Sequence, residues 1–179
     1  MAHATKWISE QDVAAALDLG DALAAVRDGF AQVGSGKGTA LEKTMLGYGD
    51  HATLHALGAA FTGAGLVGTK TWTHTPGGAD PVLVVFDAGT GALVAVIEAF
   101  ALGQLRTAAT AALGTDLLAR PDAAVLGVIG TGKQALPQVA AVAQVRSLRQ
   151  VRAFSPTAER RQAFARRVTE ELGIECRPV

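Results

Sequence analysis

Several residue types are scarce in this chain of 179 residues, and each scarcity excludes a class of protein. Cys176 is the single cysteine, so no disulfide can form within the chain, which fits a reducing compartment. Aromatic residues make up only 5% and the formal net charge is zero, so no overall charge attracts the chain to nucleic acid or to an anionic membrane. No run of about 20 apolar residues predicts a membrane span.

The charge is uneven only near the C-terminus. Eight arginines lie between Arg146 and Arg177. No aromatic residues alternate with them as they do on surfaces that stack nucleic-acid bases, which favours a solvated helix face over a nucleic-acid site. The N-terminal segment MAHATKWISEQD lacks the apolar run of a signal peptide. We therefore expect a cytoplasmic protein with no nucleic-acid partner and no membrane partner.

Apolar residues, by contrast, are abundant at 49%, enough for a buried core. Ser9 and Asp12 have the spacing of a capping box, and apolar residues from Leu19 to Phe30 recur at helical spacing up to the segment GSGKG. From Thr39 to Phe100, short apolar runs alternate with glycine-rich breaks, and PVLVVFDAGTGALVAVIEAF is typical of two strands joined at DAGTG. The first half is therefore predicted to be helical and then mainly antiparallel sheet.

The second half follows another pattern. GQLRTAATAALGTDLLAR predicts a helix that ends before Pro121, and the strand AVLGVI, the turn GTGKQA and a helix to about Arg146 follow it. The strand QVRAF, a helix from Thr157 to Leu172 and a third strand in IECRPV complete a βαβαβ run, which predicts a parallel sheet with right-handed crossovers. Parallel strands need cover on both faces, and three strands form half of a doubly wound dinucleotide domain.

The turn after AVLGVI fits the pattern G-x-G-x-x-A, and we call it the glycine turn. Its residues are Gly130, Thr131, Gly132, Lys133, Gln134 and Ala135. In such turns the first glycine permits the tight bend, the second lets backbone amides approach a pyrophosphate, and the small last residue allows close packing of helix and strand. Because this turn lies between a strand and a helix, it favours dinucleotide binding over a merely structural bend.

The end of the second parallel strand predicts the choice of cofactor. An acidic residue there would bind the adenosine ribose of NAD, but this chain has Ser155. Ser155 and Thr157, with Arg160 nearby, could hold a 2′-phosphate instead, so NADP is slightly favoured over NAD. The alternative role for Thr157 is a simple helix cap.

Two cations are candidates for substrate chemistry. Arg106 is expected in the first turn of its helix, where the helix dipole opposes a cation and a substrate carboxylate would compensate; an ion pair with Glu98 is the alternative. Lys70 lies in the apolar strand LVGTKTWTH. If Lys70 faces inward it could move protons or orient a carboxylate, and if it faces outward it is an ordinary solvated lysine.

The histidines of the sheet region offer little chemistry. His51, His55 and His74 show no metal-ligand spacing, and we expect no metal. His55 could line a pocket, but a core or surface histidine is the favoured interpretation.

Four segments together resemble the ornithine cyclodeaminase/mu-crystallin family: GTKTW, LGQLRTAATAAL, LLARPDAAVLGVIGTGKQA and VRAFSPTAERRQAFA. An R-T-A-A-T helix start followed by a nucleotide turn is a specific combination. The resemblance implies a mixed α+β substrate and dimerisation domain over residues 1–120, followed by the first half of a Rossmann domain over residues 121–179. It also implies a homodimer and NAD(P)-dependent chemistry on a small amino or imino acid. The family includes ornithine cyclodeaminases, alanine dehydrogenases and ketimine or cyclic imine reductases.

The resemblance also assigns residues. Lys70 matches the family's active-site lysine, and Arg106 with the adjoining Thr107 matches its carboxylate-binding helix start. Where the family usually has a second substrate-binding arginine, the nearest candidate is Lys43, which cannot form the same bidentate fork. Where many members have threonine, this chain has Gly103, which makes a strict ornithine cyclodeaminase less expected than another amino-acid or imine oxidoreductase.

Length is the remaining departure from the family. Family subunits are much longer, and their catalytic acid would lie beyond Val179. We therefore expect an incomplete Rossmann sheet that associates and binds NAD(P) weakly by itself. A non-catalytic, mu-crystallin-like NADP(H)-binding protein or an inactive fragment is the alternative function, and the sequence leaves it open whether this chain alone is an enzyme.

Overall fold

The computed structural model describes residues 4–179 and divides the chain into two compact units. The antiparallel unit contains the residues up to Asp18 together with Arg27–Gly103. The parallel unit contains Leu19–Val26 together with Gln104–Val179. The division therefore falls at Gly103, within a helix, and not at Pro121. The assignment of residues 1–120 to a substrate and dimerisation domain stays a prediction.

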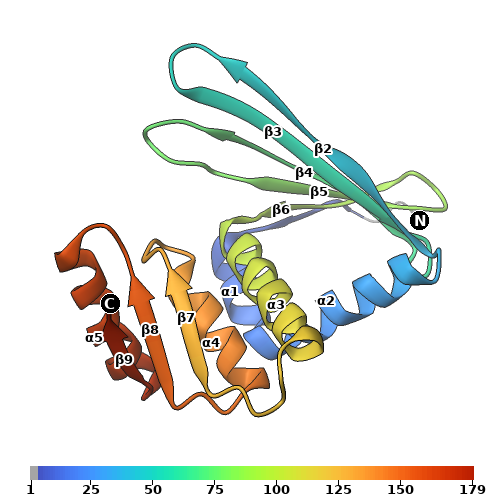
Figure 1. Ribbon diagram of the computed structural model, residues 1–179. Helices are drawn as coiled ribbons and strands as arrows, with labels where there is room; N and C mark the ends of the chain where they lie inside the picture. Colours follow the sequence, from blue (N-terminus) through green and yellow to red (C-terminus); the bar gives the residue numbers. More distant parts are fainter. Residues whose placement is uncertain (1–3) are drawn as a thin grey trace. The chain divides into compact units, whose positions relative to one another are not determined.

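A six-stranded sheet forms the antiparallel unit, in the order β1-β6-β5-β4-β3-β2 (Figure 1). Its strands are β1 (Lys6–Ile8), β2 (Gly38–Tyr48), β3 (Ala52–Phe61), β4 (Leu66–His74), β5 (Val82–Asp87) and β6 (Leu93–Glu98). All neighbours are antiparallel except β1, which runs parallel to β6. The mainly antiparallel sheet expected from the sequence is thus confirmed, including the two strands joined at DAGTG.

Two helices precede the long hairpin: α1 (Glu10–Ala16) and α2 (Leu19–Gly34). The capping box is present, because the Ser9 side chain accepts from the Asp12 amide while the Asp12 carboxylate accepts from the Ser9 amide. The end of α2 covers one end of the sheet, where the Phe61 ring lies 3.7 Å from the position of a Cβ at Gly29. We call the face of the sheet that carries Phe61 the inner face.

The opposite, outer face of this sheet carries several exposed apolar side chains. Cross-strand register places five large side chains on it, and each is more than a third exposed. They are Trp7 (64%), Leu41 (58%), Leu46 (61%), Tyr48 (43%) and Leu54 (39%). Those of β2 and β3 lie on neighbouring strands, while Trp7 lies on β1 at the other edge of the sheet. Grouped exposed apolar side chains of this kind mark a place where another surface packs.

The parallel unit follows the βαβαβ pattern, and its sheet has the order β7-β8-β9 (Figure 1). Its elements are α3 (Phe100–Leu118), β7 (Val125–Ile129), α4 (Ala135–Val145), β8 (Gln150–Phe154), α5 (Ala158–Leu172) and β9 (Glu175–Pro178). Both strand pairs are parallel. The core lies between this sheet and α4 and α5, with Val139, Val151 and Val168 fully buried.

The sequence predicted that the parallel strands need cover on both faces, but one face of β8 and β9 is mainly polar and exposed. Their exposed face carries Gln150, Arg152, Glu175 and Arg177, which form a polar ladder. The Gln150 amide donates to the Glu175 carboxylate, and Arg177 forms an ion pair with the same carboxylate at 2.7 Å. Charged side chains tolerate water on this face, whereas Ile129 at the end of β7 and Phe154 at the end of β8 leave apolar surface exposed.

Among residues 4–179, no helix combines the length and the apolar character that crossing a membrane requires.

Candidate active site

Lys70 lies at the centre of the inner face, on β4. Its neighbours across the sheet are Leu57 on β3 and Leu83 on β5, so the aliphatic part of the lysine is flanked by apolar side chains. The residue is half-buried. Its ammonium nitrogen lies 5.1 Å from the centre of the Trp72 ring, a cation–π distance. The inward-facing alternative for Lys70 therefore describes this structure better than the solvated one.

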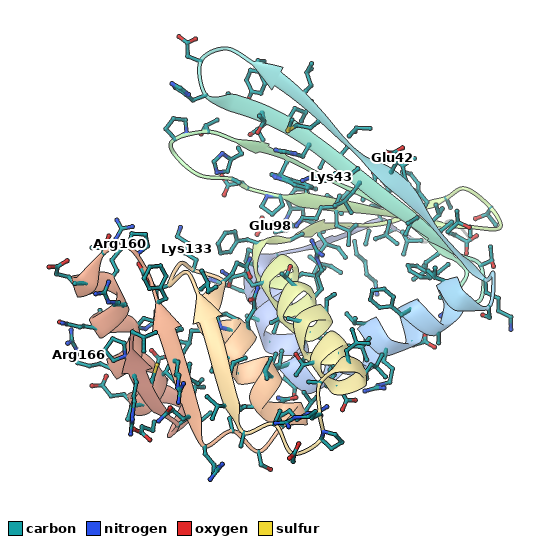
Figure 2. The ribbon with its side chains drawn as sticks, in the orientation of Figure 1. Glu42, Lys43, Glu98, Lys133, Arg160 and Arg166 are labelled. Carbon is teal, nitrogen blue, oxygen red and sulfur yellow. The ribbon has the colours of Figure 1, made fainter. Side chains whose placement is uncertain are left out.

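Lys43 is directed at the same tryptophan. A register irregularity in β2 between Leu41 and Thr44 includes this residue, and the Lys43 ammonium lies 5.4 Å from the centre of the Trp72 ring. Figure 2 labels Lys43 over the strands of the antiparallel sheet. The structure thus brings two sequence-predicted residues, Lys43 and Lys70, to one aromatic platform. Two ammonium groups beside one ring make this part of the inner face positively charged.

His55 completes this platform, and sequence reasoning gave it little weight. Its ring stacks on Trp72 with 4.8 Å between ring centres and 12° between planes. Its Nε2 forms a hydrogen bond of 2.8 Å with the Thr53 hydroxyl, while its buried Nδ1 has no partner. Partial burial lowers the pKa of His55 below the usual value of 6.5, and the positive charges of Lys43 and His74 lower this pKa further.

Glu10 fixes the start of α3 beside this platform. Its carboxylate accepts the backbone amides of Phe100 and, at 2.8 Å, of Ala101. Its own amide donates to the Glu98 carboxylate at 2.9 Å. Glu98, at the end of β6 (Figure 2), is therefore engaged by the backbone of Glu10. No local sequence signal could reveal this cap, because Glu10 and Phe100 are 90 residues apart.

The position of Arg106 within its helix differs from the sequence expectation. Because α3 begins at Phe100, Arg106 is its seventh residue and lies in the second turn, not in the first. The argument from the helix dipole is correspondingly weaker, since the dipole effect fades beyond the first turn. The Arg106 side chain is exposed and makes no ion pair within the parallel unit, whereas Thr107 is half-buried.

The glycine turn has the backbone geometry that a nucleotide turn requires. Gly130 has φ +97°, which L side chains rarely adopt, and its amide donates to the Phe154 carbonyl at 2.8 Å. A Cβ at Gly132 would meet no atom within 4 Å, so packing within the chain does not require glycine there. Ala135 is buried between α4 and the sheet, while Thr131, Lys133 and Gln134 remain on the surface side of the turn.

The first turn of α4 has no side-chain cap. Gln134 at its N-cap makes no side-chain hydrogen bond to the helix, and no acidic residue lies in the first turn. Uncapped amides at the start of a helix that follows a parallel strand are suited to bind phosphate.

Ser155 and Thr157 follow β8 at the same end of the parallel sheet. Ser155 is only 5% exposed, and its carbonyl accepts from Arg161 at 2.7 Å. Thr157 is exposed at the N-cap of α5 but makes no side-chain capping bond, so the simple capping alternative is not realised. Arg160 is the third residue of α5 and lies in its first turn, and Figure 2 shows it at the same end of the unit as Lys133.

Within residues 4–179, no cluster of three or more His, Cys, Asp and Glu side chains could hold a metal ion.

These features define a class of protein: a parallel βαβ unit with a nucleotide-type turn, joined to an antiparallel sheet with a cationic inner face. Comparison with known proteins makes the class specific. The chain belongs to the ornithine cyclodeaminase/mu-crystallin family, whose model matches residues 4–179.

Three relatives illustrate the match. The chain is similar to L-lysine cyclodeaminase from Streptomyces rapamycinicus, with 39% identity over 50% of this chain and 26% of the relative. It is 36% identical to a Delta(1)-pyrroline-2-carboxylate reductase from Bacillus cereus over 51% of this chain and 28% of the relative. An archaeal alanine dehydrogenase, solved as a dimer with bound NAD, superposes with a TM-score of 0.90 at 25% identity and covers 98% of this chain. This chain spans 56% of that dehydrogenase.

Proposed function

We propose that this protein is an NAD(P)-dependent enzyme that acts on a small amino or imino acid. The observation that carries the proposal is the glycine turn, in which a strongly positive φ at Gly130 and an uncapped start of α4 follow a parallel strand. The archaeal alanine dehydrogenase with bound NAD, similar over 98% of this chain, supports a nicotinamide cofactor. When bound, that cofactor supplies or accepts the hydride at the α-carbon of the substrate.

The chain's own residues would bind and orient the substrate. Lys70 and Lys43 share the Trp72 platform, where a substrate carboxylate would balance their charges. Arg106 offers the bidentate fork that a carboxylate fits, with Thr107 beside it, as the family resemblance implies. Lys70 is also the candidate for moving a proton at the substrate nitrogen, because an ammonium group can donate one as the imine carbon receives hydride.

We propose that the residues after β8 favour NADP over NAD. Ser155 stands where an acid would repel a 2′-phosphate, and the exposed Arg160 lies in the first turn of α5, which follows. Ser155→Asp should reverse the preference, because its carboxylate would accept from the ribose and repel the phosphate. Fluorescence titration with NADPH and NADH compares the two. Tighter binding of NADH than of NADPH by the parent protein would contradict this choice.

We also propose that the protein forms a homodimer through the outer face of the antiparallel sheet. The exposed Leu41, Leu46 and Leu54 on β2 and β3 support this interface, as does the dimer described for the archaeal alanine dehydrogenase. In a two-fold dimer, the same face of each copy packs against that of the other.

The experiment that tests the function compares the parent protein with Gly132→Val. The new side chain meets nothing within 4 Å of its Cβ position, so the fold should persist while the approach of a pyrophosphate is blocked. NADPH affinity should fall about 10-fold or more, and oxidation of NADPH with Δ1-pyrroline-2-carboxylate, followed at 340 nm, should fall with it. Unchanged affinity in a folded variant would contradict the site. NADPH binding without turnover of any imino acid tested would favour the non-catalytic alternative.

A further inference from the structure

The start of α3 contains a glycine that helix formation does not explain. Gly103 is buried in the first turn, and its amide donates to the Ala99 carbonyl as in a regular helix. Its φ is not in the left-handed region, so other residues could adopt its conformation. Glycine is among the least favourable residues inside a helix. A different constraint must therefore keep a side chain out of this position.

That constraint is the ammonium group of Lys70. A Cβ built on Gly103 would lie 2.8 Å from the Lys70 Nζ, closer than Cβ atoms approach other heavy atoms in real structures. The same Nζ lies 5.1 Å from the centre of the Trp72 ring. The lysine therefore extends from β4 so that its charged end occupies the space that a side chain at position 103 would fill.

Neither backbone can easily withdraw from this contact. The Glu10 carboxylate holds the first amides of α3, and the backbone of Lys70 is hydrogen-bonded in the sheet between Leu57 and Leu83. A side chain at Gly103 would therefore be accommodated by movement of the flexible end of the lysine. The main result would be a displaced ammonium group and not a broken fold.

We propose that Gly103 is a positioning residue for Lys70, and that its missing side chain sets where the ammonium group stands on the Trp72 platform. This inference rests on the proposed function in giving Lys70 a role toward the substrate.

The test uses two glycines of the same helix. Gly103→Ala places a methyl group against Lys70, whereas a Cβ at Gly114 meets nothing within 4 Å, which makes Gly114→Ala the matched control. Both are made in a Trp7→Phe background, so that Trp72, the other of the two tryptophans, reports alone. Three quantities are measured: the Tm, the intensity of Trp72 emission as a function of pH, and the Kd of L-proline with NADP⁺ present. L-Proline is the reduced counterpart of Δ1-pyrroline-2-carboxylate.

Gly114→Ala should raise the Tm by about 2–4 °C and leave the emission of Trp72 unchanged. Gly103→Ala should not lower the Tm. It should shift the pH at which Trp72 emission changes, and it should raise the Kd of L-proline about 10-fold. The shift in emission should disappear when Lys70→Gln is combined with Gly103→Ala, because the glycine acts through the lysine.

Two results would overturn the inference. One is a Gly103→Ala protein with the same Trp72 titration as Gly114→Ala, and the other is an equal shift that persists in the Lys70→Gln background. Failure of the parent protein to bind L-proline would contradict the proposed function instead, because the emission of Trp72 reports the position of Lys70 without any substrate.

Discussion

Arg106 makes the most specific residue-scale prediction. Its exposed guanidinium has no ion pair within the parallel unit, and the proposed function gives it the substrate carboxylate. Arg106→Lys should lower kcat/KM for an imino-acid substrate about 10-fold or more, because a charge-assisted bidentate contact contributes about 1.5–3 kcal/mol. Steady-state kinetics measure the loss, with the exposed Arg149→Lys as control. Unchanged kcat/KM in a folded Arg106→Lys protein would remove Arg106 from the site.

His55 predicts a pH dependence of stability. Its folded pKa is below the value of about 6.5 expected in the unfolded chain, so between these two values the unfolded state binds more protons. Stability should therefore be fully present above about pH 6.5 and decline as the pH falls through the folded pKa. In His55→Gln this part of the decline should be missing. Thermal unfolding at a series of pH values from about 5 to 8 compares the proteins, and parallel Tm curves would show that His55 is not the cause.

At this scale the sequence predicted the charged residues of the site but not the aromatic residues beside them. Lys70 and Lys43 were accessible through the resemblance, and Trp72 could have been added, since two residues along a strand share a face. The stack of His55 on Trp72 could not, because it depends on the register between β3 and β4. Register is set by contacts along the whole pair of strands, which no local pattern contains.

At the scale of elements, Arg146 joins the C-terminal ends of two helices. It follows α4, is only 9% exposed, and donates to three main-chain carbonyls near the end of α3 at 2.9–3.0 Å. These belong to Thr115, Asp116 and Ala119. It also forms an ion pair with the Asp116 carboxylate at 3.1 Å. One buried guanidinium therefore donates to several carbonyls at the end of α3, and the Thr115 carbonyl among them also accepts from the Ala119 amide at 2.9 Å.

Arg146→Met should destabilise the protein by about 1–3 kcal/mol, because the carbonyls of Asp116 and Ala119 lose a buried donor. The exposed Arg149→Met is the control and should change the stability by no more than about 0.5 kcal/mol. Urea unfolding measures both variants. Equal midpoints for the two would mean that solvent replaces the bonds of Arg146 at no cost.

Element positions were predictable where the signals are local. The capping box at Ser9, the break after α2 and the βαβαβ order all follow from short-range patterns and match the structure. The start of α3 was placed too late, because its cap is Glu10, a residue far away in sequence. That error carried Arg106 into the first turn of the predicted helix. Helix starts set by distant side chains lie beyond local pattern analysis.

At the scale of the whole molecule, the outer face of the antiparallel sheet predicts association. Leu46 and Leu54 are paired across β2 and β3 and lie within this exposed apolar face. Leu46→Lys should raise the dissociation constant of the proposed dimer about 10-fold or more, because it places a charge in an interface that excludes water. The control is Leu118→Lys at the end of α3, where the leucine is 88% exposed. Sedimentation equilibrium measures both, and a parent protein that stays monomeric at every concentration would contradict the interface.

The arrangement of the molecule was predictable only in outline. The switch from alternating apolar runs to a βαβ pattern correctly predicted an antiparallel part followed by a parallel part. The pairing of β1 with β6 was not, because a strand of three residues has no signal of its own. The polar ladder on β8 and β9 was not predictable either, because it depends on the register between the two strands.

The central claim is that the glycine turn of this family member binds a pyridine dinucleotide, and NMR titration of backbone amides with 2′,5′-ADP tests it most directly. This ligand carries the phosphates of the adenosine half of NADP, the half that a first βαβ unit holds. Shifts are expected at the amides of Gly130 and Gly132 and near Ser155, and 5′-ADP should bind more weakly than 2′,5′-ADP. Folded protein whose glycine-turn amides do not shift at about 10 mM ligand would contradict the account.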